Sequence, residues 1–113
     1  PPTLEELYRQ RLKEEVKNGA QRATGRFGVL SKLLRNYLRE KFDLPAVSTF
    51  SEIENHIPAE TVGADLHNKL KALYDRSELS KFAGEEISDT EFQLFYDTVE
   101  LLLERMTSGS EEG

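Results

Sequence analysis

The residues best placed to do chemistry in this chain lie in an acidic stretch, "DRSELSKFAGEEISDTEF", which joins two apolar, helix-like segments at residues 75–92. A helix, an acidic loop and a second helix are together the outline of a calcium site. A twelve-residue calcium loop that began at Asp75 would end at Glu86, as the geometry requires. Its fifth and sixth positions would be Leu79 and Ser80, where an oxygen ligand and a turn-forming glycine are needed. The stretch therefore predicts a hinge between helices and no metal site.

The remaining reactive side chains also lack a catalytic arrangement. His56 and His67 are the only histidines, and no HExxH motif or neighbouring carboxylate pattern accompanies them. The serines stand outside any GxSxG frame, and "TGRFG" lacks the Lys-Ser/Thr ending of a phosphate-binding loop. The chain contains no cysteine. We predict that the protein is not an enzyme, with no catalytic, cofactor-binding or metal-binding residues.

The size and charge of the chain limit the classes of function. At 113 residues it is long enough for one domain, which we place at residues 1–107, followed by a disordered polar tail at 108–113. Residues 1–45 carry ten Lys and Arg against six Asp and Glu, a net charge of +4. Residues 46–113 carry five against fifteen, a net charge of −10. The acidic total disfavours nucleic-acid binding, while the basic first part fits an anionic partner or a membrane surface.

Helical spacing of apolar residues begins directly after Thr3. This residue and Glu6 are spaced as a capping box. An apolar face follows at Leu4, Leu7, Tyr8, Leu12 and Val16. Asn18-Gly19 predicts a helix stop with the glycine in the left-handed cap position, although the apolar spacing continues through it. We expect a break or kink between Asn18 and Gly25, with one long helix as the alternative.

The middle of the chain predicts three further helical segments. Apolar residues recur at helical spacing over residues 27–42 and form a broad stripe on one face of the predicted helix. Pro45 ends this helix near Phe42 or Asp43. Thr49 and Glu52 form a second capping box, which opens a short helix that buries Phe50, Ile53 and Ile57. Pro58 closes this helix or lies in the first turn of the next, which runs from about Glu60 to Arg76.

The last helix is the most strongly apolar. Phe82 and Ile87 are expected to anchor the preceding connection, in which Gly84 permits a tight turn. Ser88 and Glu91 form a third capping box. The helix then buries Phe92, Phe95, Tyr96, Val99, Leu102, Leu103 and Met106. No segment alternates like a strand, so we predict an all-α bundle of four main helices plus one short helix.

Basic side chains on the helix at residues 27–42 are the candidate partner-binding site. Lys32, Arg35 and Arg39 lie mostly opposite its apolar stripe. They are either solvated charges or a surface for an acidic partner, and replacing Arg35 and Arg39 by glutamate would distinguish the two. A stand-alone regulator that contacts nucleic-acid phosphates with these side chains is the alternative.

Two longer stretches resemble a known family. "FGVLSKLLRNYLREKFDLP" followed by "TFSEIENHI", and then "LHNKLKALYDRSELSKFAGEEIS", are similar to the cytoplasmic helical tail of bacterial aerotolerance-operon membrane proteins of the BatD type. The shared features are a "YL…LP" pattern, here Tyr37-Leu38 and Leu44-Pro45, and an "F-A-G-E"-like loop, here residues 82–85. The resemblance spans roughly residues 8–106, and its motifs are apolar and structural.

The resemblance implies an interaction domain without catalytic residues. Such a tail follows a single transmembrane helix, absent from this chain, and lies at the cytoplasmic face of the bacterial inner membrane. The chain begins without methionine and is basic in its first part, and both features fit a fragment that starts just inside the membrane. The implied partners are a MoxR-type ATPase and von Willebrand A-domain proteins, in a stress-related or assembly complex.

Overall fold

The computed structural model describes the backbone of residues 1–19, 22–45 and 49–112, and the side chains of these residues except 80–83 and 108–112. Within this part of the chain the structure is all-α, with no strand, which confirms the predicted fold class. The elements are α1 (Leu4–Arg11), a π-helical segment η1 (Leu12–Lys17), α2 (Ala23–Phe42), α3 (Phe50–Glu54), α4 (Ala59–Val62), α5 (Ala64–Ala83) and α6 (Asp89–Glu112). No helix among the described residues is long and apolar enough to cross a membrane.

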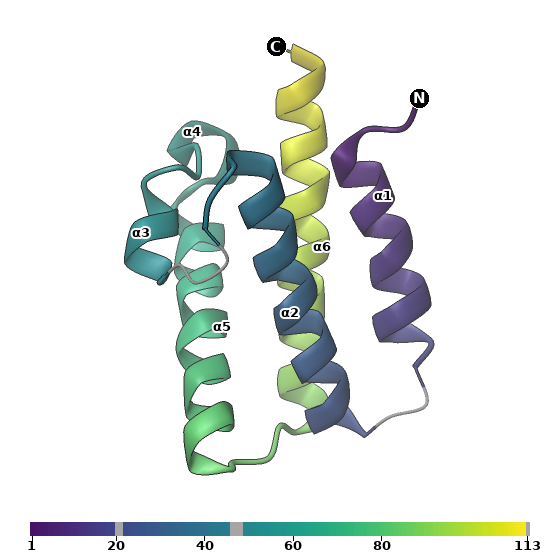
Figure 1. Cartoon of the computed structure of the whole chain (residues 1–113), viewed down its shortest axis with the longest axis vertical. Helices are drawn as coiled ribbons and strands as arrows, with labels where there is room; N and C mark the ends of the chain where they lie inside the picture. Colours follow the sequence, from purple (N-terminus) through teal and green to yellow (C-terminus); the bar gives the residue numbers. More distant parts are fainter. Residues whose placement is uncertain (20–21, 46–48, 113) are drawn as a thin grey trace.

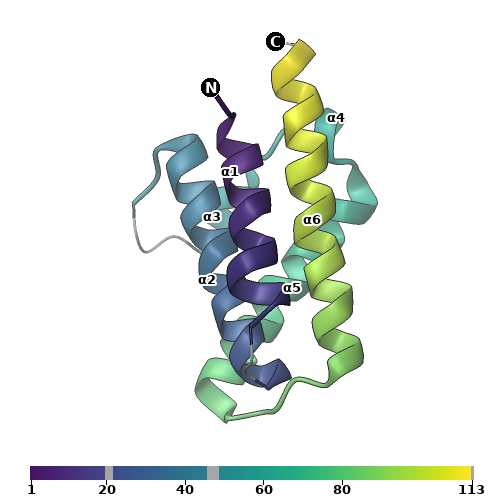
Figure 2. The ribbon, with the colours of Figure 1, turned by 90° about the vertical axis from the view of Figure 1, so that its right-hand side faces the viewer.

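Four long segments form an antiparallel bundle, and two short helices cap one end of it. α1 with η1, α2, α5 and α6 run alternately up and down (Figure 1). α1 contacts α2 and α6, α5 contacts the same two helices, and α2 also contacts α6 across the centre. The α1–α2 and α5–α6 grooves therefore lie on opposite edges of the bundle (Figure 2). α3 and α4 connect α2 to α5 and lie near the end that carries both termini (Figure 1), where α4 contacts α5 and α6.

The core is built from the apolar stripes of these helices. The stripe of α2 is buried at Phe27, Leu30, Leu33, Leu34, Tyr37 and Leu38. The predicted stripe of α6 is also buried, apart from Phe95, which is only partly covered. Val62, Leu66, Leu70 and Leu73 complete the core from α4 and α5.

The predicted break after the first helix is confirmed, but its cap differs from the prediction. Thr3 accepts a hydrogen bond from the backbone N–H of Glu6 at 3.1 Å, which caps α1. The helix passes into η1, and α2 begins only at Ala23. Gly19 does not adopt a positive φ, so the predicted left-handed glycine cap is wrong. Instead the N–H of Asn18 bonds to the carbonyl of Lys13, five residues back, as the wider π-helical turn requires. Ala20 and Gln21, inside the predicted break, lie outside the described residues.

A second break interrupts the helix predicted from about Glu60 to Arg76. The Thr49–Glu52 capping box is present and opens α3, as predicted. Pro58 then precedes α4, which ends at Val62, and Gly63 separates α4 from α5 with φ 83° and ψ 157°. Glycine tolerates this backbone conformation because it has no Cβ. Arg105 of α6 donates a hydrogen bond to the carbonyl of Val62, and this bond connects the α4–α5 turn to α6.

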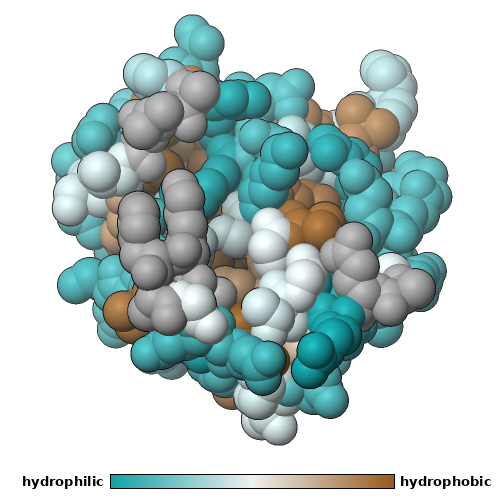
Figure 3. All heavy atoms as spheres, turned by 60° about the horizontal axis from the view of Figure 1, so that its bottom comes forward, coloured by the Kyte–Doolittle hydropathy of each residue, from teal (hydrophilic) through white to brown (hydrophobic). Residues whose placement is uncertain are grey.

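The α5–α6 connection is held by one arginine. Arg76 bonds to Glu85 at 2.8 Å, to Glu91 at 2.8 Å and to the carbonyl of Glu86 at 2.9 Å. The N–H of Ile87 donates to the hydroxyl of Thr24 on α2 at 2.9 Å. The predicted end of the preceding helix near Arg76 is wrong, because α5 continues to Ala83. Most of the stretch that outlines a calcium site in the sequence is therefore helical, and only residues 84–88 form the connection that Arg76 closes. Hydrophilic side chains surround this end of the molecule, with apolar side chains visible between them (Figure 3).

The other predictions for this region have mixed outcomes. The Ser88–Glu91 capping box is confirmed by bonds of 3.4 Å and 3.1 Å, and Ile87 is buried as expected. Gly84 has φ 67°, which agrees with its predicted turn. The side chain of Phe82 lies outside the described residues. α6 continues to Glu112, and the disorder expected for the tail at 108–113 stays a prediction.

Candidate interaction surface

The three predicted partner-binding residues do not share one environment. Arg35 is turned toward α5, where its guanidinium bonds to the carboxylate of Glu78 at 3.1 Å and the hydroxyl of Ser77 at 3.2 Å. The same group lies 4.6 Å from the centre of the Tyr74 ring. Arg35 therefore joins α2 to α5 and is not available to a partner without breaking these contacts.

Lys32 and Arg39 are exposed, and neither side chain has a hydrogen bond or ion pair with the described residues. Together with Asn36 they stand at positions i, i+4 and i+7 of α2, which places all three on one stripe of the helix. Two of the three predicted residues thus remain available to a partner. The stripe also contains the amide of Asn36, which was not among the predicted residues.

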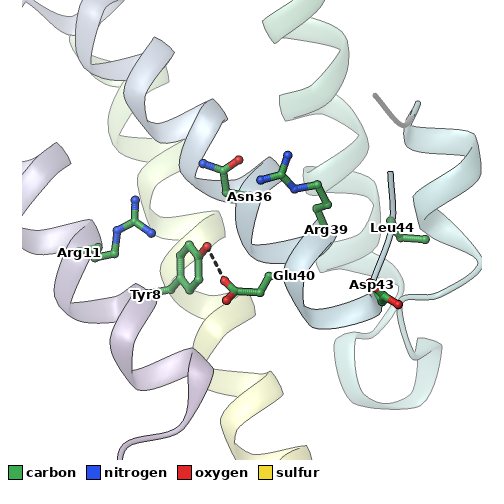
Figure 4. A pocket seen from close by; sticks show the side chains of 7 residues that line it. All are labelled: Tyr8, Arg11, Asn36, Arg39, Glu40, Asp43 and Leu44. Atoms are coloured by element: carbon green, nitrogen blue, oxygen red, sulfur yellow. Dashed lines mark hydrogen bonds between the residues drawn. The ribbon is translucent and has the colours of Figure 1, made fainter. Parts of the chain in front are cut away.

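A hollow of about 490 Å³ adjoins this stripe and is lined by residues of α1, α2 and the turn that follows α2. Asn36 and Arg39 form one side of it, and Arg11 reaches it from α1. In Figure 4 the two guanidinium groups lie on either side of the Asn36 amide. We refer to Arg11, Lys32, Asn36 and Arg39 as the α1–α2 surface. Helix α1 is thus needed to complete a surface that the sequence placed on α2 alone.

Two of the charged side chains that line the hollow, Glu40 and Arg11, already have partners within the chain. Tyr8 donates a hydrogen bond from its hydroxyl to Glu40 at 2.9 Å (Figure 4). Burial, and then the bond to Glu40, raise the pKa of Tyr8 above its ordinary value. Arg11 bonds to Glu15 at 2.7 Å, and its guanidinium lies 4.9 Å from the centre of the Tyr8 ring. Arg39 is thus the cation at the hollow that has no internal counter-ion among the described residues.

A buried ionic cluster beneath the hollow positions α1. The carboxylate of Glu5 is 1% exposed, and it accepts a 2.7 Å bond from the hydroxyl of Tyr37. Lys41 lies 2.9 Å from the same carboxylate oxygen. Burial alone would raise the pKa of Glu5, but the bonds from Tyr37 and Lys41 outweigh it and lower the pKa. The Tyr8 and Tyr37 rings meet edge to face at 5.4 Å, which connects this cluster to the hollow.

The burial of Glu5 was not predicted, because its charge suggests an exposed acid in the first turn of a helix. The actual buried face of the first segment is Glu5, Tyr8, Leu12 and Val16, whereas Leu7, predicted to be apolar core, is 45% exposed. The three-four spacing of the buried positions was readable in the sequence, and only the charge of Glu5 argued against it.

The histidines have separate surroundings. His67 lies 3.3 Å from Glu54, and His56 packs against Phe42 with ring centres 5.9 Å apart. Among the described residues, no group of three or more His, Cys, Asp or Glu side chains is arranged to hold a metal ion.

No family model, curated protein or solved structure matches this chain.

Proposed function

We propose that this chain is a non-enzymatic protein-interaction domain and that its α1–α2 surface binds an acidic segment of a partner protein. The observation that carries the proposal is the exposed guanidinium of Arg39, which borders a hollow of about 490 Å³ and has no counter-ion among the described residues. A planar guanidinium suits a carboxylate because it offers paired donors in a fixed geometry.

The charged residues that line the hollow would hold an acidic side chain of the partner in one orientation. Its carboxylate would lie beside Arg11 and Arg39, where the Asn36 amide supplies a further donor. Glu40 and Asp43 also line the hollow and would repel a second acidic group there. Lys32 lies one turn before Asn36 on α2. It extends the positive stripe toward the next residues of a bound segment.

The wider setting that we propose follows the sequence resemblance. The domain would be the cytoplasmic tail of a bacterial inner-membrane protein and would dock stress-related or assembly partners. A MoxR-type ATPase and von Willebrand A-domain proteins are the partners to examine first. The net charge of +4 over residues 1–45 supports placement near a membrane surface.

Affinity capture from native lysate, with variants compared as baits, tests the proposal. Arg39→Glu is expected to lower recovery of the specific partner by about tenfold, since a cation at the contact becomes a repelling anion. Lys71→Glu is the matched control, because it makes the same charge change at an exposed site on α5. Both variants should melt within a few degrees of the parent protein.

Two results would contradict the proposal. Equal recovery of the same proteins by the Arg39→Glu bait and the parent bait would exclude the α1–α2 surface as the contact. Recovery of nucleic acid alone, lost on nuclease treatment and steeply weakened by salt, would instead favour the nucleic-acid regulator.

A further inference from the structure

A second exposed feature lies on the opposite edge of the bundle, between α5 and α6. A hollow of about 300 Å³ is lined there by Ala72 of α5 and by Leu94, Phe95 and Leu101 of α6. Leu94 is 62% exposed, the highest value among the large apolar side chains that the structure describes. Phe95 and Leu101 are only partly buried against the core. A projecting apolar side chain and an apolar hollow thus occur side by side on one face.

Opposite charges border the same hollow. Lys69 reaches it from α5 and Asp97 from α6. Neither forms an ion pair within the described part of the chain, and Asp97 accepts only a 2.9 Å bond from the neighbouring Gln93 amide. The cation and the anion therefore stand on the two sides of the hollow, each available to a charge outside this chain.

We infer that this α5–α6 face binds a second copy of the chain about a two-fold axis. A two-fold interface brings the same patch of each copy together, so the patch must complement itself. Here Leu94 of each copy would enter the hollow of the other, and Lys69 of each would face Asp97 of the other. A different partner would need an apolar side chain, an apolar cavity, an anion and a cation in matching positions. A second copy supplies all four by symmetry, as Leu94, the hollow, Asp97 and Lys69.

The dimensions of the face predict a weak, reversible dimer. α5 has 20 residues and α6 has 24, so each presents a ridge about 30 Å long. Two adjacent helices about 10 Å wide offer roughly 600 Å² from each copy, or roughly 1,200 Å² in total. This is the lower end of the range for specific interfaces, so dimerisation should depend on concentration.

Sedimentation equilibrium from micromolar to near-millimolar protein tests the inference. The parent chain should show a reversible monomer–dimer equilibrium, and Leu94→Glu should remain monomeric throughout. Lys69→Glu and Asp97→Lys should each weaken dimerisation by about tenfold, because each places like charges opposite one another twice in the interface. The variant that carries both Lys69→Glu and Asp97→Lys should recover the parent dissociation constant, since it exchanges the two charges.

Leu7→Glu is the control, because Leu7 is 45% exposed but lies on α1, away from this face. It should leave the equilibrium unchanged. A parent chain that stays monomeric at every concentration would overturn the inference, even if a different protein were found to bind at Leu94. A dimer that tolerates Leu94→Glu, or a double variant as weak as the single ones, would also overturn it. The outcome is independent of the proposed function, since Arg39 takes no part in this face.

Discussion

The hydroxyl of Tyr37 lies 2.7 Å from the carboxylate of Glu5, and both side chains are buried although 32 residues separate them in sequence. The bond joins the first turn of α1 to the second half of α2. Lys41, one turn beyond Tyr37, completes the cluster at 2.9 Å from the same oxygen. Because α1 supplies Tyr8 and Arg11 to the neighbouring hollow, this cluster also fixes the position of one side of the α1–α2 surface.

Glu5→Gln is expected to destabilise the fold by about 2 kcal/mol, because it removes the negative charge between Tyr37 and Lys41 while the side-chain shape is kept. Glu5→Ala should cost about 3 kcal/mol, since both partners then lose their acceptor. Urea unfolding followed by circular dichroism measures both values. Glu6→Gln is the control, because the neighbouring Glu6 is exposed and its replacement should change stability by less than about 0.5 kcal/mol. If Glu6→Gln and Glu5→Gln cost the same, the carboxylate of Glu5 is not buried in this cluster.

The same cluster predicts a dependence of stability on acid. The pKa of Glu5 is lower in the folded protein than its ordinary value, so the unfolded state binds more protons at intermediate pH. The stabilisation from Glu5 is therefore present at neutral pH and is lost as the pH falls through the folded-state pKa. Unfolding free energies measured from neutral pH into this acidic range should fall less steeply for Glu5→Gln than for the parent. Glu91, whose pKa the Arg76 bond also lowers, contributes a change of the same sign in both proteins, so the difference reports Glu5.

Replacing Arg35 by alanine should destabilise the fold more than replacing Lys32, because only Arg35 contacts another helix. Arg35→Ala removes the contacts with Ser77, Glu78 and Tyr74 and should destabilise the protein by about 1 kcal/mol. Lys32→Ala removes an exposed charge without a described partner and should leave stability within about 0.5 kcal/mol of the parent. Thermal melting of the two variants measures the difference. Equal melting temperatures would contradict the role assigned to Arg35 between α2 and α5.

The sequence predicted those parts of the fold that depend on local chemistry. The capping boxes at Thr49 and Ser88 were readable because the two residues of each box are neighbours in sequence. The apolar stripes of α2 and α6 were readable because one helical period repeats over several turns. These features sufficed for the all-α class, for the starts of α1, α3 and α6 and for the end of α2.

The parts that sequence reasoning missed depend on contacts between distant segments. The partners of Glu5 are on α2, and without them its charge favours an exposed position despite its place on the buried face of α1. Arg35 resembles Lys32 and Arg39 in sequence, and its contacts with Tyr74, Ser77 and Glu78 on α5 distinguish it. The hollow at Arg39 likewise requires α1, so its lining could not be assigned before the helices were placed.

Gly63 and Gly28 should respond to alanine in opposite directions. Gly63 has φ 83° between α4 and α5, and a Cβ there would meet Arg105 only at an ordinary distance of 3.5 Å, so its requirement is conformational. Gly63→Ala should destabilise the protein by about 1–3 kcal/mol through backbone strain. Gly28 lies inside α2, and a Cβ added there would meet nothing within 4 Å, so Gly28→Ala should stabilise by about 0.5–1 kcal/mol. The melting temperature should thus fall for Gly63→Ala and rise for Gly28→Ala. A continuous helix through residues 59–83 would reverse the first result, because alanine would then favour the helix at position 63 as well.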